Sequence, residues 1–257
     1  MNKTLSPQPN QDDTNKLYSL SVPDVLALMR DGEMELVQLM PWSSNYTFLA
    51  QISKGDVSTL AIYKPCRGER PLADFPSGTL YQREVAAFVV SDALGWNLVP
   101  PTIVREGEHG VGMVQQFVEH DPEEHFFTFR DPWPAELTRM ALLDILINNA
   151  DRKGGHCLRD AQGRIWGIDH GICFHQQYKL RTVIWEPAGQ AIPPRLLNDL
   201  TTLQQALQKG HPPAQTLYPL LSPPEITAFQ QRLAHLITSA HFPVPPPGRR
   251  HVPWPLL

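Results

Sequence analysis

A lysine and a glutamate in the first half of the chain have the residue types and surroundings of a nucleotide-phosphate site. Lys64 ends the apolar segment 59–63 (TLAIY), and a lysine at the end of an apolar strand can direct its ammonium group into a cleft. Glu84 follows twenty residues later, inside a stretch with helical periodicity. A strand lysine held by a helix carboxylate is the usual arrangement of a lysine that binds nucleotide phosphates. The alternative is that both residues are ordinary surface charges.

Two polar segments in the second half interrupt apolar sequence. Residues 148–156 (NNADRKGGH) combine an acid, two bases, two amides and a histidine, and their two glycines let the backbone approach a ligand closely. Asp169-His170-Gly171 places an acid at a strand end before a glycine turn, eighteen residues after Asp151. Acid–glycine turns are common, but the spacing from Asp151 favours a functional interpretation.

Together these residues resemble a kinase catalytic core. The catalytic-loop pattern D-x-K-x-x-N corresponds to residues 151–156, and the metal-binding turn D-x-G corresponds to residues 169–171. The Asp-Arg opening and the D-H-G turn are most similar to the phosphatidylinositol 3- and 4-kinase-like superfamily, and in particular to a small bacterial family of that type. The resemblance spans residues 35–240 and also rests on segments 44–49, 64–72 and 166–171. HipA-type serine kinases resemble the chain more distantly.

This resemblance implies a two-lobed protein-kinase-like fold and ATP-dependent phosphoryl transfer to a hydroxyl group. Asp151 would accept or orient the proton of the attacking hydroxyl, and Lys153 would neutralise the transferred phosphoryl group. Lys64 would bind the phosphates and Glu84 would position Lys64. Asp169 would hold a metal ion, Mg²⁺ or Mn²⁺, that bridges the phosphates.

Two further segments would bind the nucleotide by the same resemblance. A turn between two expected strands would cover the nucleotide, and because it has no glycine its contacts would come from hydroxyl and backbone N–H groups; it consists of Ser43, Ser44 and Asn45. An interlobe hinge would bind adenine through backbone groups, and it consists of Gln116, Phe117, Val118 and Glu119.

His156 and Lys153 depart from the family pattern. His156 stands where the family has a metal-binding Asn, and it is either a metal ligand or a structural cap of the loop. Lys153 stands where the lipid kinases have histidine, which weakens the inference of a lipid substrate. A zinc site built from His156-Cys157 and Cys173-Phe174-His175 is an alternative, although the chain has no C-x-x-C or H-E-x-x-H motif and such cysteines are usually core residues.

Two other functions remain open at this point. The presence of both Asp151 and Asp169 favours an active kinase over a non-catalytic nucleotide-binding regulator, a pseudokinase, whereas His156 favours the regulator. Adenylyl transfer on the same fold is a further alternative. The acceptor is a protein, a small molecule or a lipid, and we lean away from a lipid because the chain has no basic amphipathic helix. Four basic residues form either an anion-binding patch or ordinary solvated or paired charges: Arg152, Lys179, Arg181 and Arg195.

The elements that must position these residues follow from hydrophobic periodicity and turn residues. Strands are expected over residues 35–40, 46–52, 58–64, 98–104 and 111–118, with a turn at residues 106–108 in the last hairpin. Helices are expected after an N-cap at Ser21 and over residues 79–94, 137–148, 194–209 and 224–240. A short hairpin is expected around residues 160–163.

A strand-rich half followed by a helix-rich half predicts an α+β chain of two lobes. The N-lobe, residues 17–119, would be an antiparallel sheet plus one helix, and the mostly helical C-lobe would be residues 120–242. Residues 1–16 would be a disordered tail, and residues 243–257 a proline-rich tail.

Composition excludes several classes of protein. The formal net charge is −4, which argues against a dedicated nucleic-acid binder. The mean hydropathy of −0.28 and the lack of an apolar run of about 18 residues argue against integral membrane association. The N-terminal residues 1–16 lack the apolar core of a secretory signal, and the low cysteine count predicts a soluble protein of a reducing cytoplasm. The expected partners are therefore a nucleotide and a hydroxyl-bearing acceptor.

Overall fold

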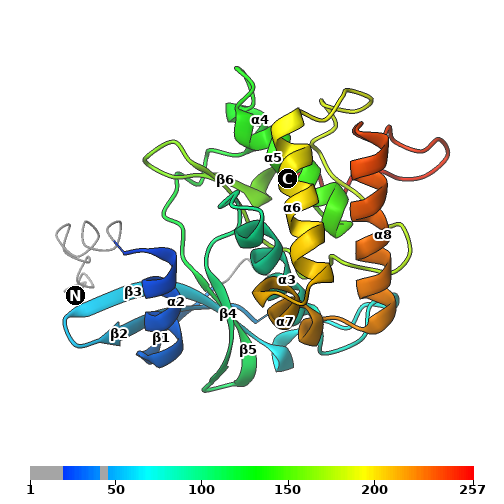
Figure 1. The fold of residues 1–257 in the computed structure, drawn as a ribbon. Coiled ribbons are helices and arrows are strands. Elements are labelled where there is room, and N and C mark those ends of the chain that lie inside the picture. The colour runs from blue at the N-terminus through cyan, green and yellow to red at the C-terminus, as the bar shows by residue number, and fades with distance from the viewer. Residues whose placement is uncertain (1–19, 41–45) are drawn as a thin grey trace.

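The computed structural model describes residues 20–40 and 46–257 and shows an antiparallel sheet beside a largely helical part (Figure 1). The sheet has the strand order β1-β2-β3-β5-β4, and every neighbouring pair is antiparallel. Its strands are β1 (Glu33–Leu39), β2 (Phe48–Lys54), β3 (Val57–Pro65), β4 (Thr102–Gly107) and β5 (Gly110–Gln116). The α+β class expected from the sequence is confirmed.

The helices and short elements complete the described part of the chain. The helices are α2 (Val22–Asp31), α3 (Leu80–Ala93), α4 (Phe126–Phe129), α5 (Ala135–Ile147), α6 (Pro194–Gln208), α7 (Pro212–Leu217) and α8 (Pro223–Ser239). A small hairpin is formed by β6 (Cys157–Arg159) and β7 (Ile165–Gly167), and single 3₁₀ turns lie at η1 (Cys66–Gly68), η2 (Gly154–His156) and η3 (Tyr218–Leu220). None of these helices is long and apolar enough to cross a membrane.

Helix α2 and one face of the sheet form the smaller of the two main cores. Ser21 Oγ accepts a hydrogen bond from the backbone N–H of Asp24, which confirms the expected N-cap. Strand β3 alternates, so that Ala61 and Tyr63 are buried against α2 while Lys64 lies on the opposite face. The alternation therefore presents the lysine to the helical part of the molecule.

The larger core joins α3 to the helices of the second half. Buried α3 residues between Ala86 and Val90 belong to the same cluster as residues of α5, α6 and α8. Figure 1 shows α3 between the sheet and the C-terminal helices, and α3 contacts α7. Helix α5 is buried on nearly all sides, as expected for a helix without a polar face. Helix α3 also packs against β4 and β5, so it joins the sheet to the helical part of the molecule.

A buried ion pair fastens α3 to α8. Arg83 donates to Glu225 Oε1 at 2.5 Å and to the backbone carbonyl of Cys173 at 3.0 Å, and both charged side chains are almost fully buried. Glu225 is itself held by the capping box with Ser222 at the start of α8. Because both charges are buried, removal of either partner would leave the other unpaired in the core.

Most expected elements are present within a few residues, and two expectations are wrong. Strand β4 begins at Thr102, because Pro100 and Pro101 provide no N–H groups for a ladder. The hairpin turn consists of residues 108–109, not 106–108. Gly107 instead pairs with Gly110 within the strands, where the Tyr63 ring leaves no room for a Cβ atom. The short helices α4 and α7 were not predicted.

Candidate active site

The ammonium group of Lys64 lies between two carboxylates. Its Nζ atom donates to Glu84 Oε1 and to Asp169 Oδ1, each at 2.8 Å. Burial alone lowers the pKa of Lys64, but the charges of Asp169 and Glu84 outweigh it and hold the pKa above its ordinary value. Lys64 is therefore a fixed cation at the junction between the sheet and the helical body.

Glu84 also fixes the turn that contains Asp169. Its second oxygen, Oε2, accepts a hydrogen bond from the backbone N–H of His170 at 2.7 Å. Asp169 has a φ of +61°, a left-handed conformation that costs a non-glycine residue roughly 1 kcal/mol. The contacts of Lys64 and Glu84 offset this strain and leave the Asp169 side chain 46% exposed. The positive charge of Lys64 holds the pKa of Asp169 well below its usual range, so the carboxylate is ionised and open to the cleft.

Residues 151–156 form a loop that contacts the same turn through His156. Lys153 Nζ lies 3.3 Å from Asp151 Oδ2, and His156 Nε2 lies 3.3 Å from Asp169 Oδ2. His156 Nδ1 lies 2.9 Å from the backbone carbonyl of Asp151, which accepts, so Nδ1 is the protonated nitrogen of the ring. Burial lowers the pKa of His156, which favours the neutral ring with a lone pair on Nε2 facing Asp169. Burial raises the pKa of Asp151, while Lys153 opposes the rise.

Two asparagines at the end of α5 shape this loop. Asn148 is left-handed, with φ +55°, and ends the helix. Its amide group donates to the backbone carbonyls of His175 and Gln177 and thereby ties the helix end to the segment after the Asp169 turn. Asn149 donates to Asp144 and accepts from the backbone N–H of Asp151 at 3.0 Å. These two hydrogen bonds fix the backbone position of Asp151 relative to α5. The sequence showed two amides here, but their roles depend on partners far along the chain.

One cavity lies at the Lys64 contacts and a second lies at the expected hinge. The first, of about 240 Å³, is lined by Lys64, Glu84, Asp151 and Asp169, by residues of α3, and by a preceding loop that contributes Glu69 and Arg70. The other, of about 160 Å³, is lined by the expected hinge residues Gln116, Phe117, Val118 and Glu119, and by Leu60 and Trp166. The backbone N–H of Phe117 donates to Leu60 O at 2.9 Å and is therefore not available to a ligand. The remaining expected nucleotide contacts, Ser43, Ser44 and Asn45, lie outside the described residues.

The basic residues considered for an anion-binding patch include two that are paired with acids. Arg152 is fully buried and paired with Asp144 at 3.0 Å, which agrees with the alternative of paired charges. Lys179 of the same set pairs with Asp74 at 2.7 Å. Asp144 could have indicated from the sequence that a basic residue is buried here, because an acid inside a densely apolar helix requires a buried cationic partner.

The donor atoms present fit a divalent cation at Asp169. A carboxylate suits Mg²⁺ and Mn²⁺, and a neutral imidazole nitrogen suits Mn²⁺. For zinc the chemistry is less favourable: burial raises the pKa of Cys157 to about 12, which disfavours the thiolate that zinc binds. Within residues 20–40 and 46–257, no three His, Cys, Asp or Glu side chains gather as a metal centre.

Comparison with known proteins identifies the family. Residues 72–209, more than half of the chain, match the family model described as phosphatidylinositol 3- and 4-kinase. The chain belongs to the phosphatidylinositol 3- and 4-kinase family. The expectation from the two polar segments is thus confirmed, and this family member combines a kinase-like two-lobed fold with the Lys64, Glu84 and Asp169 contacts described above.

Relatives of this phosphatidylinositol 3- and 4-kinase family member are both bacterial and plant proteins. Protein Rv2133c of Mycobacterium tuberculosis is 39% identical over 267 residues, covering 90% of this chain and 95% of the relative. Phosphatidylinositol 4-kinase gamma 4 of Oryza sativa is 32% identical over 122 residues, covering 40% of this chain and 22% of the plant protein. Among solved structures, the Helicobacter pylori proinflammatory kinase CtkA has a TM-score of 0.48 at 11% identity, covering 83% of this chain and 94% of that one.

Proposed function

We propose that the protein is an ATP-dependent phosphotransferase that acts on a hydroxyl group. The observation that supports this most directly is the position of Lys64, whose ammonium group is 2.8 Å from both Glu84 and Asp169. This arrangement holds a cation beside an accessible carboxylate, next to a cavity that also reaches Asp151. Phosphoryl transfer depends mainly on positioning and on electrostatic stabilisation of the phosphate oxygens, and these groups supply both.

In this proposal Asp151 and Lys153 act on the reacting groups. The raised pKa of Asp151 makes its carboxylate a better proton acceptor for the attacking hydroxyl. Lys153, 3.3 Å from Asp151, holds a positive charge where negative charge develops on the transferred group. The two residues come from one loop, so their separation is set locally.

The nucleotide would lie across the two cavities, with its base at the hinge and its phosphates at Lys64. Leu60 and Trp166 would provide apolar surface for the base. Val118 would provide the backbone contact at the hinge, because the N–H groups of Gln116 and Phe117 already donate to Pro101 O and Leu60 O. Asp169 and His156 would hold the divalent cation, which when bound neutralises phosphate charge. Family membership supports the nucleotide and the cation, and the acceptor would be a protein hydroxyl or a small alcohol in preference to a lipid.

Incubation with ATP labelled at the γ or the α position, with Mg²⁺ or Mn²⁺, tests the proposal. A kinase transfers the γ label to an acceptor, or to water at a low rate, and never the α label. Transfer of the α label would show adenylyl transfer. Nucleotide binding without transfer of either label would show a non-catalytic regulator.

Nucleotide binding should depend on Lys64. At a concentration 100-fold above Kd, ATP with Mn²⁺ should stabilise the protein by about 2.7 kcal/mol, which raises Tm by about 5–10 °C. Lys64→Met should remove most of this shift because it deletes the cation that faces the phosphates. Differential scanning fluorimetry measures both effects. Lys54→Met is a matched control, because Lys54 is an exposed lysine at the end of the neighbouring strand. An equal shift in the two variants would refute the phosphate role of Lys64.

His156 should determine the preference between metal ions. Imidazole nitrogen suits Mn²⁺ better than Mg²⁺, so the wild-type initial rate should be higher with Mn²⁺. His156→Asn replaces this nitrogen by an amide oxygen and should lower the ratio of the Mn²⁺ rate to the Mg²⁺ rate several-fold. The exposed His241 provides the control, since His241→Asn should leave the ratio as it is. If His156→Asn also leaves it unchanged, His156 is a structural residue of the loop.

A further inference from the structure

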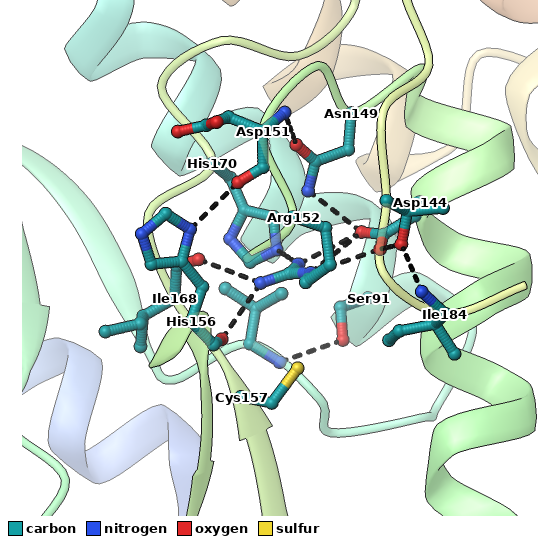
Figure 2. Close-up of polar contacts among 12 residues, drawn as sticks. Ser91, Asp144, Asn149, Asp151, Arg152, His156, Cys157, Ile168, His170 and Ile184 are labelled. Atoms are coloured by element: carbon teal, nitrogen blue, oxygen red, sulfur yellow. Dashed lines mark hydrogen bonds and ion pairs between the residues drawn. The ribbon is translucent and has the colours of Figure 1, made fainter. Parts of the chain in front are cut away.

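The guanidinium group of Arg152 is the centre of a buried network between the catalytic loop and the Asp169 turn. Arg152 is completely buried, as is its ion-pair partner Asp144 on α5. Figure 2 shows the side chain of Arg152 extending from the loop into the space between α5 and the turn. Its Nη1 donates to the backbone carbonyls of His156 at 2.9 Å and Ile168 at 3.0 Å. One planar group thus contacts a helix, the loop and the turn.

The helix end of this network is rigid. Asp144 receives hydrogen bonds from Arg152 Nε and Nη2, from Asn149 and from the hydroxyl of Thr182. The backbone of Arg152 is held as well, because its N–H donates to Arg181 O and its carbonyl accepts from Val183 N. The position of the guanidinium is therefore set by the core and not by the turn.

His170 brings the turn into contact with this fixed group. Arg152 Nη2 lies 2.5 Å from His170 Nε2, and a guanidinium has no acceptor atom, so Nε2 accepts the hydrogen bond. A neutral ring then carries its proton on Nδ1, which has no hydrogen-bond partner among the described residues. The imidazole satisfies Arg152 and leaves its own donor unused, which indicates that the ring is placed for the contact with Arg152.

We propose that Arg152 and His170 are positioning residues that fix Asp169 relative to Asp151. Arg152 follows Asp151 directly in the chain, and His170 follows Asp169 directly, so their hydrogen bond sets the spacing of the two acids. The backbone N–H of His170 donates to Glu84. The turn is therefore held by α3 through its backbone and by Arg152 through the His170 side chain. The proposal rests on the proposed function, because it assigns the two acids to one reaction.

Replacing His170 by leucine or by glutamine separates this role from simple packing. Leucine fills similar space without an acceptor, whereas the side-chain oxygen of glutamine can accept at the position of Nε2. Amide hydrogen exchange of the protein without ligand should show about 10-fold faster exchange in His170→Leu, in residues 151–157 and 167–171 together. His170→Gln should recover most of the protection. In turnover assays kcat should fall about 10- to 100-fold in His170→Leu, with a smaller change in KM for ATP, because a displacement of about 1 Å is enough for such a loss.

Each possible result decides the matter. Unchanged exchange and kcat in His170→Leu would overturn the proposal, as would a His170→Gln variant as impaired as His170→Leu, because ring shape would then be the cause. If His170→Leu does not fold, Arg152→Lys provides a second test. Lysine keeps the ion pair with Asp144 but loses the hydrogen bond to His170, so amide exchange should again be faster in residues 151–157 and 167–171. A wild-type protein that transfers no phosphate refutes the proposed function, while the exchange comparison, made without nucleotide, still decides the positioning role.

Discussion

Replacing Asp151 by asparagine should lower kcat for phosphoryl transfer about 10²- to 10⁴-fold, the range typical of a positioned proton acceptor. Affinity for ATP should stay nearly unchanged, because Asp151 makes no contact with Lys64 and its nearest charged partner is Lys153. Asparagine keeps the shape of the side chain but removes its basicity and the negative charge that faces Lys153. Single-turnover rates with γ-labelled ATP and calorimetric titration of the nucleotide measure the two effects separately.

Two other variants serve as a control and as a comparison for Asp151→Asn. Asp56→Asn changes an exposed acid in the turn between β2 and β3 and should leave both quantities at wild-type values. Asp169→Asn should weaken metal-dependent nucleotide binding as well as turnover, because in the proposed reaction Asp169 holds the divalent cation that binds the phosphates. If Asp151→Asn and Asp169→Asn had the same pattern, the two acids would not have the separate roles assigned to them.

Replacing Arg152 by methionine should lower the free energy of unfolding by about 3–5 kcal/mol, because it leaves the carboxylate of Asp144 buried without a cation. Lys179→Met is the matched comparison. It breaks the ion pair with Asp74, whose side chain is 47% exposed, and should cost no more than about 1 kcal/mol. Urea denaturation followed by circular dichroism gives both values. Similar small losses in the two variants would show that Asp144 is neutralised by another group.

Local sequence patterns predicted the elements and the residue types of the site. The apolar segment 59–63 predicted strand β3 with Lys64 near its end. The capping preference of serine predicted that α2 starts after Ser21. The apolar run before residues 148–156 predicted that the loop follows a buried helix, and α5 is that helix. These features depend on neighbours within a few positions, which a sequence displays directly.

Features that depend on distant partners were not predicted. Arg83 and Glu225 are 142 positions apart, and neither residue alone indicates that α3 packs with the C-terminal helices. The contact between Arg152 and His170 likewise spans 18 positions and two loops. Lys64, by contrast, could be paired with Glu84 in advance, because a strand lysine held by a helix carboxylate is the usual arrangement of a lysine that binds nucleotide phosphates.

The anchoring of α3 has a mechanical consequence for the cleft at Lys64. Glu84 lies on α3, and the buried ion pair between Arg83 and Glu225 ties this helix to α8 and to the larger core. Lys64 comes from the sheet, which shares a separate small core with α2, while α3 also packs against β4 and β5. Any tilt of β3 away from α3 must therefore break the contacts of Lys64 with Glu84 and Asp169, so these two contacts oppose opening of the cleft.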